Sequence, residues 1–152
     1  VSNIPKTDAK LIVLPELIDN YEEISKRLTD NYAVTSIREN DAHVGVLISR
    51  DGIIFKQKQI HKSNQHNWIT DFSDQLQTIE LPFGRLAIII GEDSRYPETF
   101  RLAAYQNAEI VAVSFTVGER WETEFGLLER SVENRFSIVA ATRPREIFGS
   151  FG

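Results

Sequence analysis

Short runs of consecutive apolar residues alternate with stretches whose apolar residues recur every three or four positions. Residues 11–14 and 86–90 are wholly apolar, which is typical of strands buried on both faces. Two stretches have the spacing of one helix face: Leu17, Tyr21, Ile24 and Leu28, and Trp121, Phe125, Leu128 and Val132. Because strands buried on both faces need helices to cover them, the pattern predicts a layered α/β or α+β domain.

Shorter patterns complete the predicted set of elements. The turn Arg50-Asp51-Gly52 favours a hairpin between two strands, and Pro97 with Glu98 favours the first turn of a helix. Residues 61–77 are polar and aperiodic, so we expect a loop. We see no linker or repeat and expect one domain over residues 1–152. Further strands are expected at residues 33–37, 44–48, 53–60, 110–115 and 136–141, and helices at residues 97–106 and 119–135.

Charge and composition exclude several classes of protein. Twenty-two acidic and 17 basic residues give a net charge of −5, which argues against binding to nucleic acid or to an anionic membrane. The apolar runs are too short to span a bilayer. The chain has no cysteine, so disulfides, thiolate metal sites and a cysteine nucleophile are excluded. With no signal segment visible, a cytoplasmic protein is expected.

Single residues indicate little chemistry by themselves. Glu16 follows an apolar strand, where α/β proteins place functional groups, but spacing alone favours a solvated carboxylate at the start of a helix. Lys58 fits an exposed strand face. His61 and His66 have no third ligand at metal spacing, so no metal site is expected. Ser94 has no base placed beside it, which favours a turn or N-cap role.

Several motifs occur together and in a fixed order. A strand ending in Pro15-Glu16 comes first, followed by a lysine-bearing strand that leads to His61. The stretch Gly91-Glu92-Asp93-Ser94-Arg95-Tyr96-Pro97-Glu98 then follows an apolar strand, and Glu133-Asn134 comes last. In this combination the chain resembles the carbon–nitrogen hydrolase, or nitrilase, superfamily.

The resemblance implies a fold and a set of roles. It implies an α-β-β-α four-layer sandwich, here incomplete because family domains are longer, and no cofactor. Glu16 would be the general base and Lys58 the oxyanion-stabilising group; Lys56 or a β-bulge is the alternative, because two residues rather than one separate Lys58 from His61. Gly91 stands at the nucleophile position, and Asp93, Pro97 and Glu98 would shape the elbow after it. The family's second glutamate has no clear match: Glu80 is misplaced, and His66 or Asn67 are the alternatives.

The missing nucleophile leads to a functional hypothesis. Glycine cannot form a covalent intermediate, so the resemblance implies a domain that has lost thiol catalysis and serves in binding, regulation or structure. The alternative is a working amidohydrolase or nitrilase that uses Glu16 and Lys58, and an unrelated α/β domain is a third possibility. By resemblance the chain forms a homodimer through helices 97–106 and 119–135, with Phe100, Tyr105, Trp121 and Phe125 exposed. A fusion to another domain is also expected.

Overall fold

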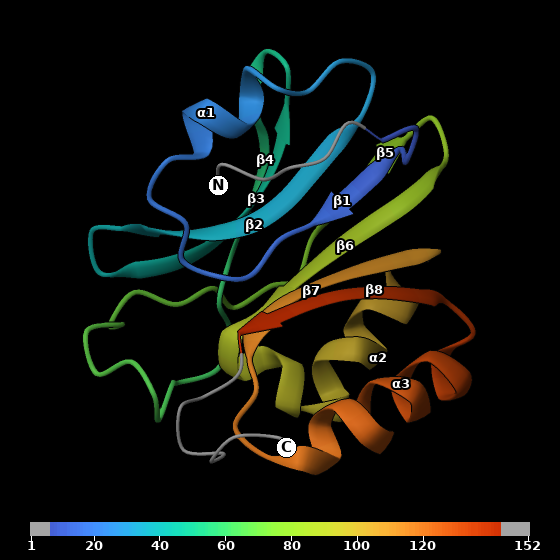
Figure 1. Cartoon of the computed structure of the whole chain (residues 1–152). Coiled ribbons are helices and arrows are strands. Elements are labelled where there is room, and N and C mark those ends of the chain that lie inside the picture. The colour runs from blue at the N-terminus through green and yellow to red at the C-terminus, as the bar shows by residue number, and fades with distance from the viewer. Residues whose placement is uncertain (1–6, 144–152) are drawn as a thin grey trace, which may run out of the picture.

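The computed structural model describes residues 7–143. Eight strands and five helical stretches of five to nine residues follow one another (Figure 1). In chain order they are β1 (Leu11–Val13), α1 (Tyr21–Ser25), β2 (Tyr32–Glu39), β3 (Ala42–Ser49), β4 (Gly52–Lys58), β5 (Thr78–Leu81), β6 (Gly84–Ile90), the 3-10 helix η1 (Gly91–Arg95), α2 (Pro97–Tyr105), β7 (Ile110–Thr116), the π-helix η2 (Glu122–Gly126), α3 (Leu127–Asn134) and β8 (Ser137–Arg143).

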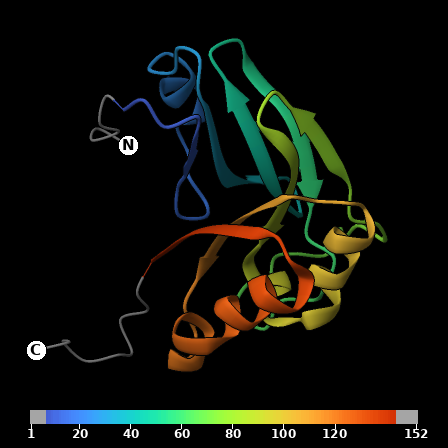
Figure 2. The same ribbon diagram turned by 90° about the vertical axis from the view of Figure 1, so that its right-hand side faces the viewer.

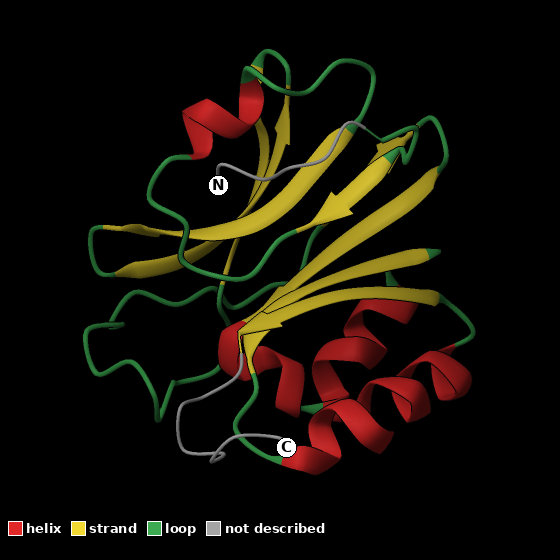
Figure 3. Ribbon diagram, in the orientation of Figure 1, coloured by secondary structure: helices red, strands yellow, loops and turns green. Residues whose placement is uncertain are grey.

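Two four-stranded sheets form the centre of the molecule. Their strand orders are β1-β2-β3-β4 and β5-β6-β7-β8, and β6, β7 and β8 run parallel to one another. Figure 3 shows the sheets facing each other, with α1 outside the first and α2 and α3 outside the second; Figure 2 shows the same layers from the side. The expected α-β-β-α sandwich is therefore confirmed.

The inner faces of the two sheets pack closely because β3 carries a glycine where they meet. A Cβ atom at Gly45 would lie 2.7 Å from Cγ2 of Ile88 and 2.9 Å from Cγ2 of Ile90, both on β6. Only a residue without a side chain allows this approach. Around this contact lies a shared core of buried residues: Val34, Leu47, Leu81, Leu86, Ile88, Ile90 and Ala112.

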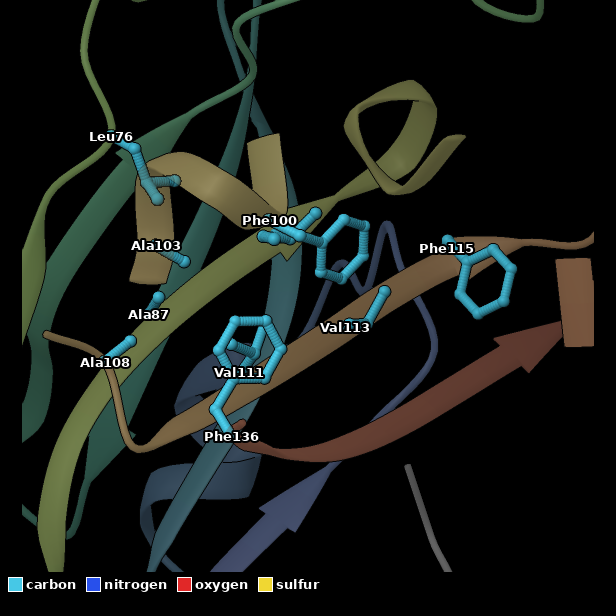
Figure 4. Close-up of a cluster of buried hydrophobic side chains, with 10 residues drawn as sticks. Leu76, Ala87, Phe100, Ala103, Ala108, Val111, Val113, Phe115 and Phe136 are labelled. Atoms are coloured by element: carbon cyan, nitrogen blue, oxygen red, sulfur yellow. The ribbon is translucent and has the colours of Figure 1, made fainter. Parts of the chain in front are cut away.

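A second core lies between sheet β5–β8 and its helices (Figure 4). Phe100 of α2 is 0% exposed, and its ring centroid lies 6.4 Å from that of Phe136. Ala87 and Val111 supply the sheet side of this cluster. The wholly apolar run predicted at residues 86–90 thus serves two cores, because alternate side chains point to opposite faces of the sheet.

Three elements differ from the sequence prediction. Residues 17–28 do not form one helix, and α1 covers only Tyr21–Ser25. Leu17 is excluded from it because its φ of 57° does not occur in a right-handed helix. Strand β5 was not predicted; it pairs with β6 where residues 61–77 end. The stretch expected as a helix at residues 119–135 contains the π-helix η2 before α3 begins.

Candidate active-site remnant

Glu16 is held at the junction of the two sheets by backbone contacts on either side. The Pro15 carbonyl accepts a hydrogen bond from Oγ1 of Thr35 on β2 at 2.6 Å. The Leu14 carbonyl accepts one from Oγ of Ser114 on β7 at 2.8 Å. The segment after β1 is therefore tied to both sheets, and the Glu16 carboxyl is only 2% exposed. Glu16 therefore lies just after strand β1, where the sequence places it. Its carboxylate is buried, so the alternative of a solvated carboxylate is wrong.

The residue after Glu16 is strained. A φ of 57° is unusual for leucine, and such strain persists only where surrounding contacts hold it. Here the Leu17 N–H donates to Oγ of Ser36 at 3.0 Å, and the Ile18 N–H donates to the Ser36 carbonyl at 2.9 Å. The strained turn fixes the direction in which the Glu16 side chain leaves the backbone.

Two imidazoles flank the Glu16 carboxylate. Nε2 of His43 lies 3.7 Å from one carboxylate oxygen, and Nε2 of His66 lies 3.8 Å from the other. Within residues 7–143 neither oxygen has a donor at hydrogen-bonding distance and angle, and Nε2 of His66 has no partner at that geometry either. The His66 and Thr116 side chains nevertheless lie close enough to favour the negative charge. Burial acts to raise the pKa of Glu16, but His66, Thr116 and His43 outweigh it, so the pKa lies below its usual value. The carboxylate is ionised at neutral pH.

His43 is completely buried and hydrogen-bonded at both ring nitrogens. Nε2 lies 2.6 Å from Oγ of Ser36, and Nδ1 lies 2.8 Å from Oε1 of Gln59. Complete burial lowers the pKa of His43 below its usual value, although the Glu16 carboxylate works against this. The imidazole is therefore neutral at pH 7.

Gly91 faces this His43–Gln59 pair at the start of η1. A Cβ atom at Gly91 would lie 2.6 Å from Oε1 of Gln59 and 3.0 Å from both Cε1 and Nδ1 of His43. Its φ of 51° is also in the left-handed region that favours glycine. The structure thus brings both Gly91 and Glu16 next to His43. The space that a side chain at residue 91 would need is filled by His43 and Gln59.

The structure does not bring Lys58 to this cluster. Nζ of Lys58 lies 2.6 Å from Oδ2 of Asp71, and its side chain is 44% exposed. Lys56, the alternative, pairs with Glu39 at 2.7 Å and is likewise exposed. Gln59 does reach the cluster. It directly follows the last residue of β4, and it is 0% exposed.

A β-bulge in β4 explains why Gln59, and neither lysine, points toward the cluster. Leu47 pairs with Phe55 and Ile48 with Ile53, so Ile54 is left without a partner. As a result Ile53 packs toward the α1 side of the sheet, whereas Phe55 packs between the sheets. Every later side chain of β4 is shifted by one position, which turns Gln57 and Gln59 inward and both lysines outward.

The elbow residues have structural contacts. The Asp93 carboxylate, 2% exposed, accepts hydrogen bonds from the Ile60 N–H, the His61 N–H and Nδ1 of His61, each at 2.8 Å. Burial raises the pKa of Asp93 despite these donors. Pro97 begins α2 as predicted, and Glu98 lies exposed in its first turn.

An ion-pair cluster links η1 to the π-helix η2. Nε of Arg95 bonds to Oε1 of Glu122 at 2.5 Å, and Nη1 of Arg95 lies 3.2 Å from Oε1 of Glu92. The Gly118 N–H donates to the other Glu122 oxygen at 2.7 Å. Partial burial acts to lower the pKa of Arg95, but the two carboxylates hold it above its usual value. The cluster stiffens the chain that follows Gly91.

Sequence reasoning missed three residues of the site. His43 is a lone histidine in an otherwise apolar strand, which was a signal for a buried imidazole. The order Lys56-Gln57-Lys58-Gln59 places lysines on one face and amides on the other, although either face could have been the inner one. Trp68, whose ring centroid lies 5.7 Å from that of His66 and 6.1 Å from that of His43, comes from a loop without any periodic signal.

The structure distinguishes between the residues considered for the place of the family's second glutamate. His66 lies beside Glu16, whereas Glu80 pairs with Arg85 at 2.9 Å on the surface.

Among residues 7–143 no group of three or more acidic or histidine side chains is arranged to hold a metal ion. The same part of the chain contains no helix with the length and apolar character needed to cross a membrane.

Solved structures define the class of fold. The chain superimposes with a TM-score of 0.77 on a cysteine-to-alanine mutant of the amidase from Nesterenkonia AN1, of the nitrilase superfamily, at 15% identity over 91% of this chain and 66% of that one. It matches Saccharomyces cerevisiae Nit3, of branch 10 of the same superfamily, with a TM-score of 0.72 at 18% identity over 95% and 65%. The chain therefore has the fold of the nitrilase superfamily of carbon–nitrogen hydrolases, as its motifs indicate.

Two further similarities concern longer proteins. The chain is 29% identical over 106 residues to the "Probable hydrolase YhcX" of Bacillus subtilis (strain 168), which is 66% of this chain and 21% of that protein. It covers 32% of a glutamine-dependent NAD+ synthetase from Acinetobacter baumannii, with 90% of its own length, a TM-score of 0.73 and 16% identity. No protein-family profile matches the chain. The chain thus spans about a fifth of its curated relative.

Proposed function

We propose that this chain is a nitrilase-fold module that has lost thiol-dependent hydrolysis of carbon–nitrogen bonds and acts by binding, as a regulatory or structural domain. The observation that carries the proposal is at residue 91. A glycine stands where the resemblance places the nucleophile, and His43 and Gln59 lie against it. No cysteine exists elsewhere in the 152 residues to replace the missing sulfur.

The loss of a cation from the site supports the same proposal. In the family chemistry a lysine stabilises the oxyanion that forms on nucleophilic attack. Here the inward-facing residue is the neutral Gln59, and its amide groups are already hydrogen-bonded to His43 and to the His61 carbonyl. Lys58 is paired with Asp71 at the surface. Among residues 7–143, the site beside Gly91 therefore has a neutral amide and no cation that faces a substrate oxygen.

One observation favours a second candidate, an amidohydrolase that uses water directly. Glu16 is buried and ionised, and its oxygens have no hydrogen-bond partner among residues 7–143. Such a carboxylate could take a proton from water, with His66 beside it. Lys58 does not contribute to this candidate in the present structure, because it pairs with Asp71 on the outward face of β4.

Measurement of ammonia release separates the two candidates. We expect no ammonia above the buffer value from a panel of aliphatic and aromatic amides and nitriles, with an active amidase of this superfamily assayed in parallel. Ammonia release by the unsubstituted chain that Glu16→Gln abolishes would overturn the proposed loss of activity. Release that survives Glu16→Gln would come from a contaminant, since no other buried carboxylate among residues 7–143 is unpaired on both oxygens.

We further propose that the module forms a homodimer through the outer faces of α2, η2 and α3. Exposed apolar side chains are concentrated there, and we call them the helix surface: Leu102, Tyr105, Trp121, Phe125, Leu128 and Val132. Phe100, which the sequence suggested as a contact, is not part of it, because its side chain lies in the core. A concentration of exposed apolar side chains is typical of an interface.

Charged substitutions test this interface. The double variant Phe125→Arg/Leu128→Arg should convert a species of twice 17.4 kDa into one of 17.4 kDa in light scattering after size-exclusion chromatography, because two cations cannot be buried without partners. The matched control is Ile54→Arg, an exposed apolar residue on β4 away from the helices, which should leave the mass unchanged. A mass of 17.4 kDa for the unsubstituted chain at its highest soluble concentration would contradict the proposal.

Two expectations about the whole protein stay predictions. The resemblance predicts a fusion to a further domain, and the similarity to longer proteins is compatible with it. A cytoplasmic location is likewise a prediction. Both can be checked on the complete gene and by fractionation of cells that express it.

A further inference from the structure

A continuous chain of hydrogen bonds crosses the site beside Gly91. Its donors and acceptors can be assigned in one way only. Nε2 of Gln59 donates to the His61 carbonyl at 2.7 Å, so Oε1 of Gln59 is an acceptor. Nδ1 of His43 must therefore carry the proton that Oε1 accepts, and Nε2 of the neutral ring accepts from the hydroxyl of Ser36. All polar atoms of the His43 and Gln59 side chains have partners in this direction.

The same atoms occupy the space next to residue 91. An added Cβ would approach Oε1 of Gln59 to 2.6 Å, which is shorter than any non-bonded carbon–oxygen contact allows. Gln59 cannot move aside freely, because its amide is held at one end by His43 and at the other by the His61 carbonyl. His61 is in turn held by Asp93.

We propose that His43 and Gln59 form a polar plug that replaces the side chain of a nucleophile and requires residue 91 to be glycine. The plug is the pair of these two side chains, both 0% exposed. The space beside residue 91 is part of the hydrogen-bonded core. The inference rests on the proposed function only for assigning position 91 to the nucleophile; the packing around Gly91 stands by itself.

The plug is a structural unit and not a new catalytic group. The hydrogen bonds from Ser36 to His43 and from His43 to Gln59 have the same sequence as those of a nucleophile, a base and an orienting amide. Ser36, however, is 0% exposed, and its oxygen already accepts a hydrogen bond from the Leu17 N–H at 3.0 Å. A substrate carbon has no approach to that oxygen.

A double-mutant cycle tests the plug. Gly91→Ala should lower the melting temperature by roughly 5–10 °C, because the methyl group overpacks a site that cannot relax. Gln59→Ala by itself should also lower it, since it leaves Nδ1 of His43 without a partner. In the double variant the two losses should not add, because removal of the Gln59 amide makes room for the methyl group.

The matched control separates backbone strain from the clash. Gly52, in the β3–β4 hairpin, has a φ of 111° and nothing within 4 Å of an added Cβ. Gly52→Ala therefore gives an upper limit for the backbone cost of Gly91→Ala, because L residues reach a φ of 51° more easily than a φ of 111°. A Gly91→Ala loss larger than that of Gly52→Ala cannot come from backbone strain alone and would support the plug. A Gly91→Ala loss that is the same with and without the Gln59 side chain would overturn it.

A measurement on the unsubstituted protein avoids any failure to fold. Nitrogen-15 spectra of the imidazoles should show His43 neutral at pH 7 with its proton on Nδ1, and this proton should exchange slowly with solvent because the ring is buried. A proton on Nε2, or rapid exchange, would overturn the hydrogen-bond direction on which the plug depends. Ammonia release would instead overturn the proposed function and leave these results unchanged.

Discussion

Replacement of Asp93 by asparagine should lower the free energy of unfolding by about 3–5 kcal/mol, because a buried acceptor of three hydrogen bonds becomes a partial donor. The side chains have the same shape. The NH2 group of asparagine, however, would face the N–H of Ile60 or of His61, both of which now donate to the carboxylate at 2.8 Å. One buried backbone N–H would then lose its partner.

Urea unfolding followed by circular dichroism measures this loss from the shift of the midpoint. The control is Asp74→Asn, an exposed carboxylate, which should change stability by less than about 0.5 kcal/mol. The parallel stacking of His61 on Tyr96, now 3.9 Å between ring centroids, should loosen in Asp93→Asn alone. A variant as stable as the control would show that Asp93 does not anchor the elbow.

Truncation of Phe100 to alanine should cost about 3–5 kcal/mol, the range for removal of a buried aromatic ring. The ring is 0% exposed and lies between α2 and the sheet, where it packs with Phe136 (Figure 4). Its cavity cannot close easily, because α2 is fixed at its start by Pro97 and the elbow.

The matched control for Phe100 is Ile54→Ala, an apolar residue that is 44% exposed at the bulge of β4. We expect a loss under about 1 kcal/mol there, since much of that side chain is already in water. Thermal and urea unfolding should rank the two variants in the same order. Equal losses would contradict the assignment of Phe100 to the core between helix and sheet.

Local patterns were sufficient for most of the strands. The wholly apolar run at residues 86–90 predicted a strand with two buried faces, and β6 packs on one core with each face. Pro97 predicted the start of α2. The helix expected at residues 17–28 failed because its periodic pattern says nothing about the strained turn at Leu17, which tertiary hydrogen bonds to Ser36 hold in place.

The candidate site was predicted only in part. Glu16 and Gly91 are both next to His43, and their placement at strand ends could be inferred from the motifs. His66 was predicted only as one alternative for the second glutamate, and Trp68 was not predicted. Both lie in an aperiodic loop whose course depends on contacts such as the Thr70 and Asp71 N–H groups donating to the Asp41 carbonyl. Such contacts join segments that are distant in sequence.

The sequence by itself determined that no thiol is available, because no cysteine occurs in it, and that a glycine follows the apolar strand at residue 91. Only the tertiary structure decided which side chain faces that glycine. The alternation of Lys56, Gln57, Lys58 and Gln59 is visible in the sequence, but its phase relative to the core is not. A single unpaired residue, Ile54, sets that phase through the register of β3 and β4, and so turns an amide inward and a lysine toward water.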